Sequence, residues 1–551
     1  MNQKKWRYTP PFAISAPMKF CFRLCFCILI SLFSASAFAA TYDVIIRNGR
    51  VIDGAGNPAY FADIAITNGK IAAIGRIDGD ARTELDAKGD VVAPGFIDVH
   101  THADDITDLP LGENFVRMGV TTIVVGNCGG SELDLAKLFH NIEDKHVSPN
   151  VASLIGHNTV RGKAMGGSFM RPPTAEEMAS MKTMVEQGMK DGAVGLSTGL
   201  IYLPGTFAKT PEIIELAKVA SAYDGIYTSH MRDEGTGISN SLAELFRIAR
   251  EAHIRAEISH IKLSGNASWN KADQVLAAIE QARAEGLDIT EDQYAYTASS
   301  TGIGQLVPDA ALEGGHKKFL ERLTDPKQKA EIIDGMKAML AKNGRTNYAY
   351  AVIAYYDHNT NLNGLNIPEA AKAVRGSDSI EDQMEVILDI ETHHGASGVF
   401  HGMNEADLQK FMQFPNTMIA SDSGVREFGK GFPHPRGYGD NARVLAHYVR
   451  DLRILRLEDA IRKMTSLPAE TFRFKDRGLL REGNWADVVV FDPATVEEHS
   501  TYKDPHHYAT GFKYVLVNGV TVVENDKHTG AKPGMALRHA IPPQLTAKSL
   551  P

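Results

Sequence analysis

The feature that most constrains the fold is a series of eight short apolar runs, each followed by a helical stretch or a long connection. The runs cover residues 96–100, 122–125, 152–155, 194–197, 226–229, 257–259, 288–291 and 417–420. Apolar strands that alternate with helices are typical of βα units, because the helices cover both faces of a parallel sheet. Eight such units predict a TIM-like (β/α)8 barrel of the α/β class.

The spacing of the last two runs indicates an insertion in the barrel. The stretch between them, around 303–404, is too long for a single crossover connection. We expect an inserted, mainly helical subdomain there, near the mouth of the barrel. With this insertion, the barrel is predicted to cover residues 95–467.

Both ends of the chain carry a different pattern. Short strand-like runs separated by Asn-Gly turns occupy residues 40–94 and return in residues 468–551. The two ends are therefore expected to combine into one small β-sandwich domain, followed by a C-terminal tail.

The first 39 residues are predicted to be an export signal. Lys19 and Arg23 precede an apolar stretch at 24–33, and Ala37-Phe38-Ala39 forms a small-residue cleavage site. Met18 is an alternative start, and an uncleaved anchor helix is the alternative structure, which the short apolar stretch disfavours. We expect cleavage after Ala39 and a periplasmic location, with no membrane association afterwards.

Charge and composition bear on the partner. The formal net charge is -9 and the isoelectric point is about 6.1, with no long basic run. Such a chain lacks the basic surface that binds nucleic acid. We expect a small-molecule partner, and the sequence does not specify an oligomeric state.

Cysteine usage draws attention to one position. Cys21, Cys25 and Cys27 lie within the predicted signal, so the mature chain keeps only Cys128 and can form no intramolecular disulfide. In an oxidising compartment a single thiol is expected to be buried or bound to a metal. Cys128 directly follows the second predicted strand and is flanked by Gly126, Gly129 and Gly130.

Other metal-binding and acid–base side chains follow other predicted strands. Carboxyl ends of barrel strands meet at one rim, where the active sites of such barrels are built. Six side chains occupy these positions: His100, His102, Cys128, His230, His260 and Asp422. A set of unrelated core histidines is the alternative interpretation, which the shared rim position disfavours. The sequence therefore predicts a metal centre with a nearby carboxylate.

These motifs resemble the N-acyl-D-amino acid deacylase (D-aminoacylase) family of the amidohydrolase superfamily. The resemblance runs from about residue 42 to 539 and rests on Ile45-Ile46-Arg47-Asn48-Gly49, His100-Thr101-His102, residues 192–202, Ser229-His230-Met231-Arg232, Ser259-His260-Ile261-Lys262 and His434-Pro435-Arg436. Many relatives bridge two metals with a carboxylated lysine on the fourth strand, and residues 194–197 contain no lysine. D-aminoacylase-like enzymes use a cysteine after the second strand, which Cys128 matches.

The resemblance implies a zinc-dependent amidohydrolase acting on N-acyl-D-amino acids. Cys128, His230 and His260 would hold one tight zinc ion. His100 and His102 would belong, with Asp422, to a possible second and weaker metal site. Asp422 would act as base toward water and then as acid toward the leaving amine.

The same resemblance implies a set of substrate-binding residues. Lys262 and Arg436 suit the free carboxylate of the substrate, and Tyr202 could bind that group or the oxyanion. Tyr294 and Ser299 are expected to line the pocket. One departure from the family pattern is Ser423, which stands where a glycine usually follows the aspartate.

Two alternatives remain open at this level. The first is a dipeptidase acting on dipeptides with a C-terminal D-residue, which would use the same machinery. The second is a catalytically inactive scaffold of the same fold, which the complete ligand set disfavours.

Overall fold

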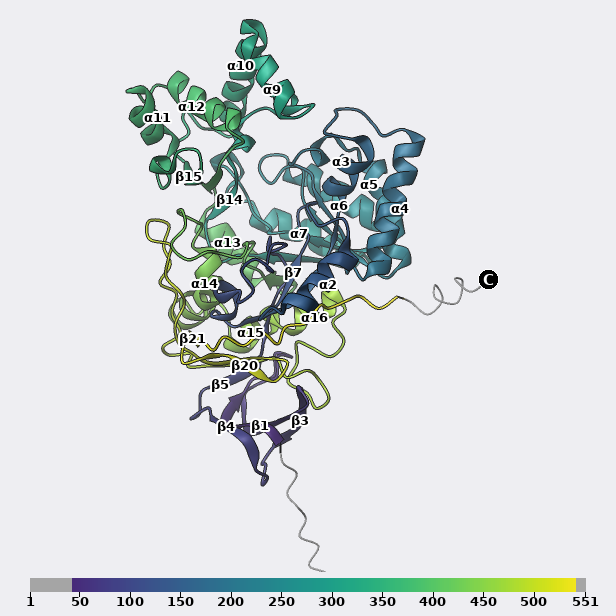
Figure 1. Cartoon of the computed structure of the whole chain (residues 1–551), viewed down its shortest axis with the longest axis vertical. Coiled ribbons are helices and arrows are strands. Elements are labelled where there is room, and N and C mark those ends of the chain that lie inside the picture. The colour runs from purple at the N-terminus through teal and green to yellow at the C-terminus, as the bar shows by residue number, and fades with distance from the viewer. Residues whose placement is uncertain (1–41, 542–551) are drawn as a thin grey trace, which may run out of the picture. The chain divides into compact units, whose positions relative to one another are not determined.

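The structure is a computed structural model that describes residues 42–541 (Figure 1). The predicted export signal, residues 1–39, lies outside the described residues. Among residues 42–541, no helix is both long and apolar enough to cross a membrane.

Parallel strands form a barrel in the central part of the chain. They are β6 (Phe96–Asp98), β7 (Val120–Val125), β8 (Asn150–Ser153) with its continuation β9 (Ile155–Gly156), β10 (Gly195–Gly199), β11 (Ile226–His230), β12 (Arg255–Ile258), β13 (Ile289–Gln293) and β17 (Thr417–Ile419). Parallel ladders join β6 to β8 and β9 to β17. Each predicted run overlaps one of these strands, which confirms the barrel.

The barrel closes between β17 and β6. Asp422 N–H donates to His100 O at 2.9 Å, and His102 N–H donates to Ser423 O at 2.9 Å. Ser423 therefore uses its backbone to join the last strand to the first. These bonds hold the turn after β17 beside the turn after β6.

Helices surround the barrel, and their ends follow local sequence signals. They include α2 (Leu135–Lys145), α3 (His157–Met165), α4 (Ala175–Asp191), α5 (Thr210–Ala222), α6 (Ile238–Ala252), α7 (Ala272–Ala284), α13 (Glu405–Gln413), α14 (Arg436–Arg443) and α15 (Leu457–Met464). A capping box between Thr174 and Glu177 starts α4. In α6, Leu242, Leu245 and Ile248 lie on one helix face and are buried in the main core.

The insertion between β13 and β17 has its own apolar core. Its helices are α8 (Asp309–Leu312), α9 (His316–Thr324), α10 (Pro326–Lys342), α11 (Ile367–Arg375) and α12 (Ile380–Thr392). Phe319, Met336 and Ile387 are buried together in this core. The insertion also contains an antiparallel sheet in the order β14 (Ala298–Gly302), β16 (Ser397–His401), β15 (Ala351–Tyr355), which the sequence analysis did not predict.

The two ends of the described chain share one nine-stranded sheet (Figure 1). It contains β1 (Tyr42–Val51), β2 (Tyr60–Thr67), β3 (Lys70–Gly75), β4 (Ala81–Asp86), β5 (Val91–Pro94), β18 (Val488–Phe491), β19 (Phe512–Val517), β20 (Val520–Glu524) and β21 (Lys527–His528). Antiparallel pairing of β5 with β18 joins the ends. Asn518 and Gly519, with φ of 50° and 78°, form the turn between β19 and β20.

The C-terminal segments also contact the barrel. Helix α16 (Ser466–Phe472) spans the expected domain boundary at 467. Its residues Leu467 and Phe472 pack with Met418 of β17, so the helix belongs to the barrel. Beyond β21, Val151 N–H donates to Met535 O and Leu537 N–H donates to Val151 O. Part of the region expected to belong to the β domain therefore packs on the barrel.

Candidate metal centre

The structure brings the six predicted metal-site residues together at the carboxyl ends of the barrel strands. His100 and His102 follow β6, Cys128 follows β7, His230 ends β11, His260 follows β12 and Asp422 follows β17. Cys128, His260 and Asp422 have left-handed φ angles of 52°, 37° and 49°. Such angles are unfavourable for residues with a side chain, by roughly 1–2 kcal/mol each, and they cluster at functional sites.

Three imidazoles surround the Cys128 thiol. Its Sγ lies 3.3 Å from His100 Nε2, 3.5 Å from His260 Nε2 and 3.7 Å from His230 Nδ1. Burial by itself raises the pKa of the thiol, but the charge on His100 and hydrogen bonds with His100, His102 and His230 together outweigh burial and hold the pKa well below its usual range. A thiolate is the form of cysteine that binds a metal.

This donor set fits a zinc ion. Zinc bonds of about 2.3 Å to sulfur and about 2.0–2.1 Å to nitrogen, at a tetrahedral angle, place ligand S and N atoms about 3.5 Å apart. The distances from Cys128 Sγ to His230 and His260 agree with this spacing. Donor atoms of Cys128, His260 and His100 all lie within 4.8 Å of one another, so this group could hold one ion, and His230 Nδ1 lies 3.7 Å from the same thiol.

A second group of possible ligands lies beside the first. His102 Nε2 is 3.1 Å and His100 Nε2 is 3.7 Å from Asp422 Oδ1, so these three side chains could share another ion. His100 belongs to both groups. Its Nδ1 contacts Asp292 Oδ2 at 3.1 Å, which orients the ring.

Asp422 is buried and in contact with a cation. Arg436 NH1 lies 2.8 Å from Asp422 Oδ2. Burial alone raises the pKa of Asp422, but the charges of Arg436 and His100 hold it well below its usual range. The carboxylate is therefore ionised at neutral pH, as a base must be.

Two carboxylates near the metal centre were not predicted from the sequence. Asp292, in β13, contacts His100 and also accepts the backbone N–H of His260 at 3.0 Å. Glu234 lies between His230 and His260, with contacts of 3.4 Å and 3.1 Å. The sequence could have indicated a contact between Glu234 and His230, because the two residues are four positions apart. The contact of Glu234 with His260 depends on the fold and could not be read from the sequence.

Three of the predicted substrate-binding residues line a cavity beside the metal centre. Tyr202, Lys262 and Ser299 line a cavity of about 290 Å³ that also contains His230, His260 and Asp422. The Tyr202 ring packs against His230, with 4.8 Å between ring centroids. Lys262 Nζ is 2.8 Å from Glu234 Oε1.

Arg436 and Tyr294, the other two predicted substrate-binding residues, are buried and are not among the residues that line this cavity. The Arg436 guanidinium is 4.5 Å from the centroid of the Tyr294 ring, and both side chains are fully buried. Tyr294 directs its hydroxyl to Met403 Sδ at 3.7 Å. Tyr294 thus supports the arginine, and its hydroxyl is engaged away from the metal ligands.

The insertion completes the cavity. Met339, Tyr350 and Phe400 of the insertion are among the residues that line it. The site is therefore built by the barrel rim and the insertion together.

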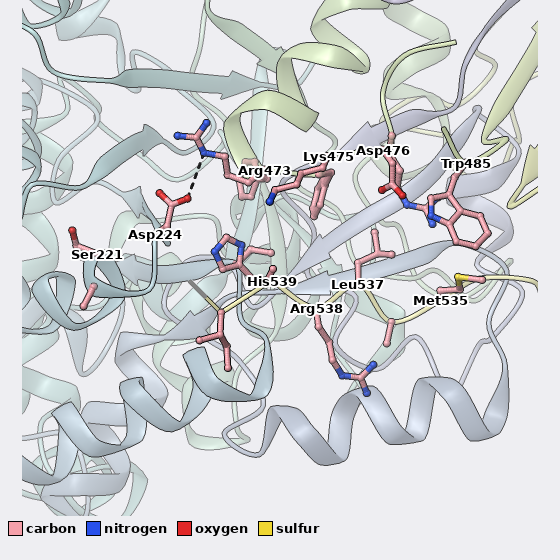
Figure 2. A pocket seen from close by; sticks show the side chains of 18 residues that line it. Ser221, Asp224, Arg473, Lys475, Asp476, Trp485, Met535, Leu537, Arg538 and His539 are labelled. Carbon is pink, nitrogen blue, oxygen red and sulfur yellow. Dashed lines mark ion pairs between the residues drawn. The ribbon is translucent and has the colours of Figure 1, made fainter. Parts of the chain in front are cut away.

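Another cavity, of about 820 Å³, lies at the amino ends of β10 and β11 (Figure 2). Arg473, Lys475 and His539 contribute to its wall, and Arg473 contacts Asp224 at 3.9 Å. None of the predicted metal or catalytic residues lines this cavity. The predicted metal centre therefore lies at the opposite rim of the barrel.

Comparison with known proteins agrees with this arrangement. A D-aminoacylase of Alcaligenes xylosoxydans xylosoxydans is 35% identical over 530 residues, covering 90% of this chain and 97% of that protein. The structure of N-acyl-D-glutamate deacylase from Bordetella bronchiseptica, complexed with zinc and a phosphonate mimic of the tetrahedral intermediate, matches with a TM-score of 0.77. It is 33% identical and covers 90% of this chain and 100% of that chain.

A third relative concerns the metal centre itself. A structure of a D-aminoacylase matches with a TM-score of 0.76. That enzyme has a binuclear metal centre, in which one metal activates and the second attenuates. Identity is again 33%, over 90% of this chain and 100% of that chain. The Amidohydrolase family model matches residues 83–523. The chain belongs to the amidohydrolase family and, within it, to the D-aminoacylase family.

Proposed function

We propose that this protein hydrolyses the amide bond of N-acyl-D-amino acids and releases a carboxylate and a free D-amino acid. The observation that carries the proposal is the Cys128 thiol at the barrel rim, within 3.7 Å of three imidazoles. This arrangement lies in a chain that is 35% identical to a D-aminoacylase. Cys128, His230 and His260 would hold one zinc ion tightly, and His100, His102 and Asp422 would form a weaker second site.

Asp422 would move the protons of the reaction. When bound, zinc would polarise the amide carbonyl and promote ionisation of water. The ionised Asp422 carboxylate would accept a proton from the attacking water and pass it to the leaving nitrogen. His102, 3.1 Å from Asp422 Oδ1, would keep the carboxylate oriented.

The free carboxylate of the substrate requires a cationic partner. Arg436 Nε is buried and has no hydrogen-bond partner among residues 42–541, so it has a donor to offer. Lys262 supplies a second charge beside the metal ligands. Tyr202 would contact the same carboxylate or the developing oxyanion.

A stereochemical assay tests this function. The purified mature protein, loaded with zinc, is incubated with paired N-acetyl-D- and N-acetyl-L-amino acids and with dipeptides that end in a D-residue. We expect release of D-amino acids from the N-acetyl-D compounds. Faster turnover of the L compounds would contradict the proposal, and preference for the dipeptides would favour the dipeptidase alternative.

We also propose that the chain is exported to the periplasm. Lys19, Arg23, the apolar stretch at 24–33 and the Ala37-Phe38-Ala39 site support this location. Expression of the full chain in a Gram-negative host, followed by fractionation and mass spectrometry, should give a periplasmic product that begins at Ala40. A full-length product retained in the cytoplasm would contradict export.

A further inference from the structure

We infer that Glu234 is a positioning residue shared by two zinc ligands, His230 and His260. This inference rests on the proposed zinc site. His230 directs Nδ1 toward Cys128 Sγ and Nε2 toward Glu234 Oε2, at 3.7 Å and 3.4 Å. His260 directs Nε2 toward Cys128 Sγ and Nδ1 toward Glu234 Oε1, at 3.5 Å and 3.1 Å. In each ring, one nitrogen faces the thiol and the other faces the same carboxylate.

This geometry fixes which nitrogen carries the proton. An imidazole that binds a metal through one nitrogen must carry its proton on the other. The outer nitrogens of both rings then lie within 3.4 Å of Glu234, which has one oxygen for each of them, and His230 Nε2 is buried with no other hydrogen-bond partner among the described residues. A carboxylate in this place orients the ring and raises its basicity as a ligand.

The fold holds Glu234 in place. Its backbone carbonyl accepts the Ser264 N–H at 2.8 Å, which joins the loop after β11 to the segment after β12. The side chain is only 10% exposed. Because His230 ends β11 and His260 follows β12, a single anchored carboxylate sets the relative orientation of ligands from two strands.

Glu234 could instead be a metal ligand, because it also groups with His230 and His260. The Lys262 ammonium argues against this role. Lys262 Nζ lies 2.8 Å from Glu234 Oε1 and 2.6 Å from His260 Nδ1, so a cation already occupies the place of such an ion. In the zinc-loaded site, the proton on His260 Nδ1 is compatible with Glu234 as acceptor and not with Lys262 as donor.

The test measures zinc affinity by competition with a chelator, together with the unfolding temperature of the zinc-free protein. Glu234→Gln should weaken zinc binding by roughly 10–100-fold, while the zinc-free protein unfolds near the wild-type temperature. Glu234→Asp keeps the negative charge but moves it away from the histidines by one methylene group. The zinc affinity of this variant should therefore lie between those of wild type and Glu234→Gln. If Glu234→Gln does not fold, the Asp variant carries the test.

Two control variants separate the role of Glu234 from other effects. Glu244→Gln removes a carboxylate that forms an ion pair with Arg232, a residue of the loop after β11. Lys262→Met removes the ammonium group that contacts Glu234. Both variants should bind zinc with an affinity within about threefold of wild type, because neither removes a carboxylate that orients a zinc ligand. Equal losses in Lys262→Met and Glu234→Gln would mean that zinc binding depends on the intact Glu234–Lys262 ion pair and not on Glu234 as acceptor of the histidine N–H groups, and the inference would be wrong.

Cobalt substitution gives a readout that a general structural effect would not move. In Glu234→Gln, the d–d absorption bands of bound Co²⁺ should shift while the thiolate charge-transfer band from Cys128 remains. Unchanged spectra with unchanged zinc affinity would overturn the inference. If the wild-type protein itself binds no zinc, the proposed function fails instead, so the two failures are distinguishable.

Discussion

At the scale of single residues, Cys128 determines the chemistry of the metal centre. Its buried thiol lies within 3.7 Å of His100, His230 and His260, and the charge on His100 is the largest of the effects that stabilise the thiolate. We expect Cys128→Ala to lose bound zinc and activity together, because the two remaining imidazoles offer too few ligands for a tight site. Elemental analysis of the zinc content would check this. Full zinc retention in the variant would mean that Cys128 is not a ligand.

Asp422 should behave differently from Cys128, because it belongs to the proton-transfer step. Asp422→Asn keeps the shape of the side chain and leaves Cys128, His230 and His260 intact. We expect kcat to fall by roughly 10²–10⁴-fold with the tight zinc ion retained, as for the loss of a general base. Steady-state kinetics and zinc analysis on one preparation would measure both. Activity within tenfold of wild type would exclude this role.

At the scale of elements, the turns after the strands place the ligands. Gly129 directly follows Cys128, and a Cβ atom there would collide with the Asn158 side chain and come within 2.7 Å of Gly199 N. Asn158 cannot move aside easily, since its amide donates to Gly199 O and Tyr202 O at 3.0 Å and 3.2 Å. The close packing of β7, β10 and α3 therefore depends on glycine at this position.

Gly129→Ala should accordingly destabilise the protein more than an alanine at an open glycine. Gly166 ends α3 with a φ of 71°, close to the 77° of Gly129, but nothing lies within 4 Å of its added Cβ. We expect about 1 kcal/mol for Gly166→Ala and an additional ~1–3 kcal/mol of overpacking for Gly129→Ala. Thermal unfolding of both variants would compare them. Equal unfolding temperatures would show that the crowding at Gly129 is relieved without cost.

The barrel elements could be predicted from the sequence, and those of the insertion only in part. Strand β7 is buried on both faces and contains Val120, Ile123, Val124 and Val125, so it is recognisable as an apolar run. β14 contains Ser299, Ser300 and Thr301 and is only partly buried, so its sequence lacks that pattern. Likewise, ligands at strand ends follow from the barrel topology, but Glu234 contacts His260 only because the loops after β11 and β12 meet.

At the scale of the whole molecule, the insertion has an apolar core of its own, whereas the terminal β sheet contributes residues both to the barrel core and to a smaller core of its own. The insertion core lies beside an unusual ionisable group. Glu391 of α12 has a buried Oε1 that finds no hydrogen-bond partner in the described part of the chain, and burial raises the pKa of its carboxyl to about 7. The folded protein thus keeps this proton to a higher pH than the unfolded chain, in which the carboxyl ionises near its ordinary value.

The stability of the protein should therefore depend on pH through Glu391. Its stabilising contribution is fully present below about pH 4.5 and is lost as the pH rises through about 7, because only the folded state still binds the proton in this window. In Glu391→Gln the side chain stays neutral, so the unfolding temperature of the variant relative to wild type should increase from pH 5 to pH 8. Thermal unfolding at several pH values would measure this difference.

A second carboxylate of α12 provides a control with the opposite shift. Asp382 forms hydrogen bonds with Arg375 and Ser379, which lower the pKa of its carboxyl to about 2. Its contribution is present above its ordinary pKa of 3.8 and is lost only as the pH falls toward 2. Asp382→Asn should therefore lower the unfolding temperature by the same amount at pH 5 and pH 8. If Glu391→Gln also shows a constant difference from wild type across this range, Glu391 ionises in the folded protein near its ordinary pKa.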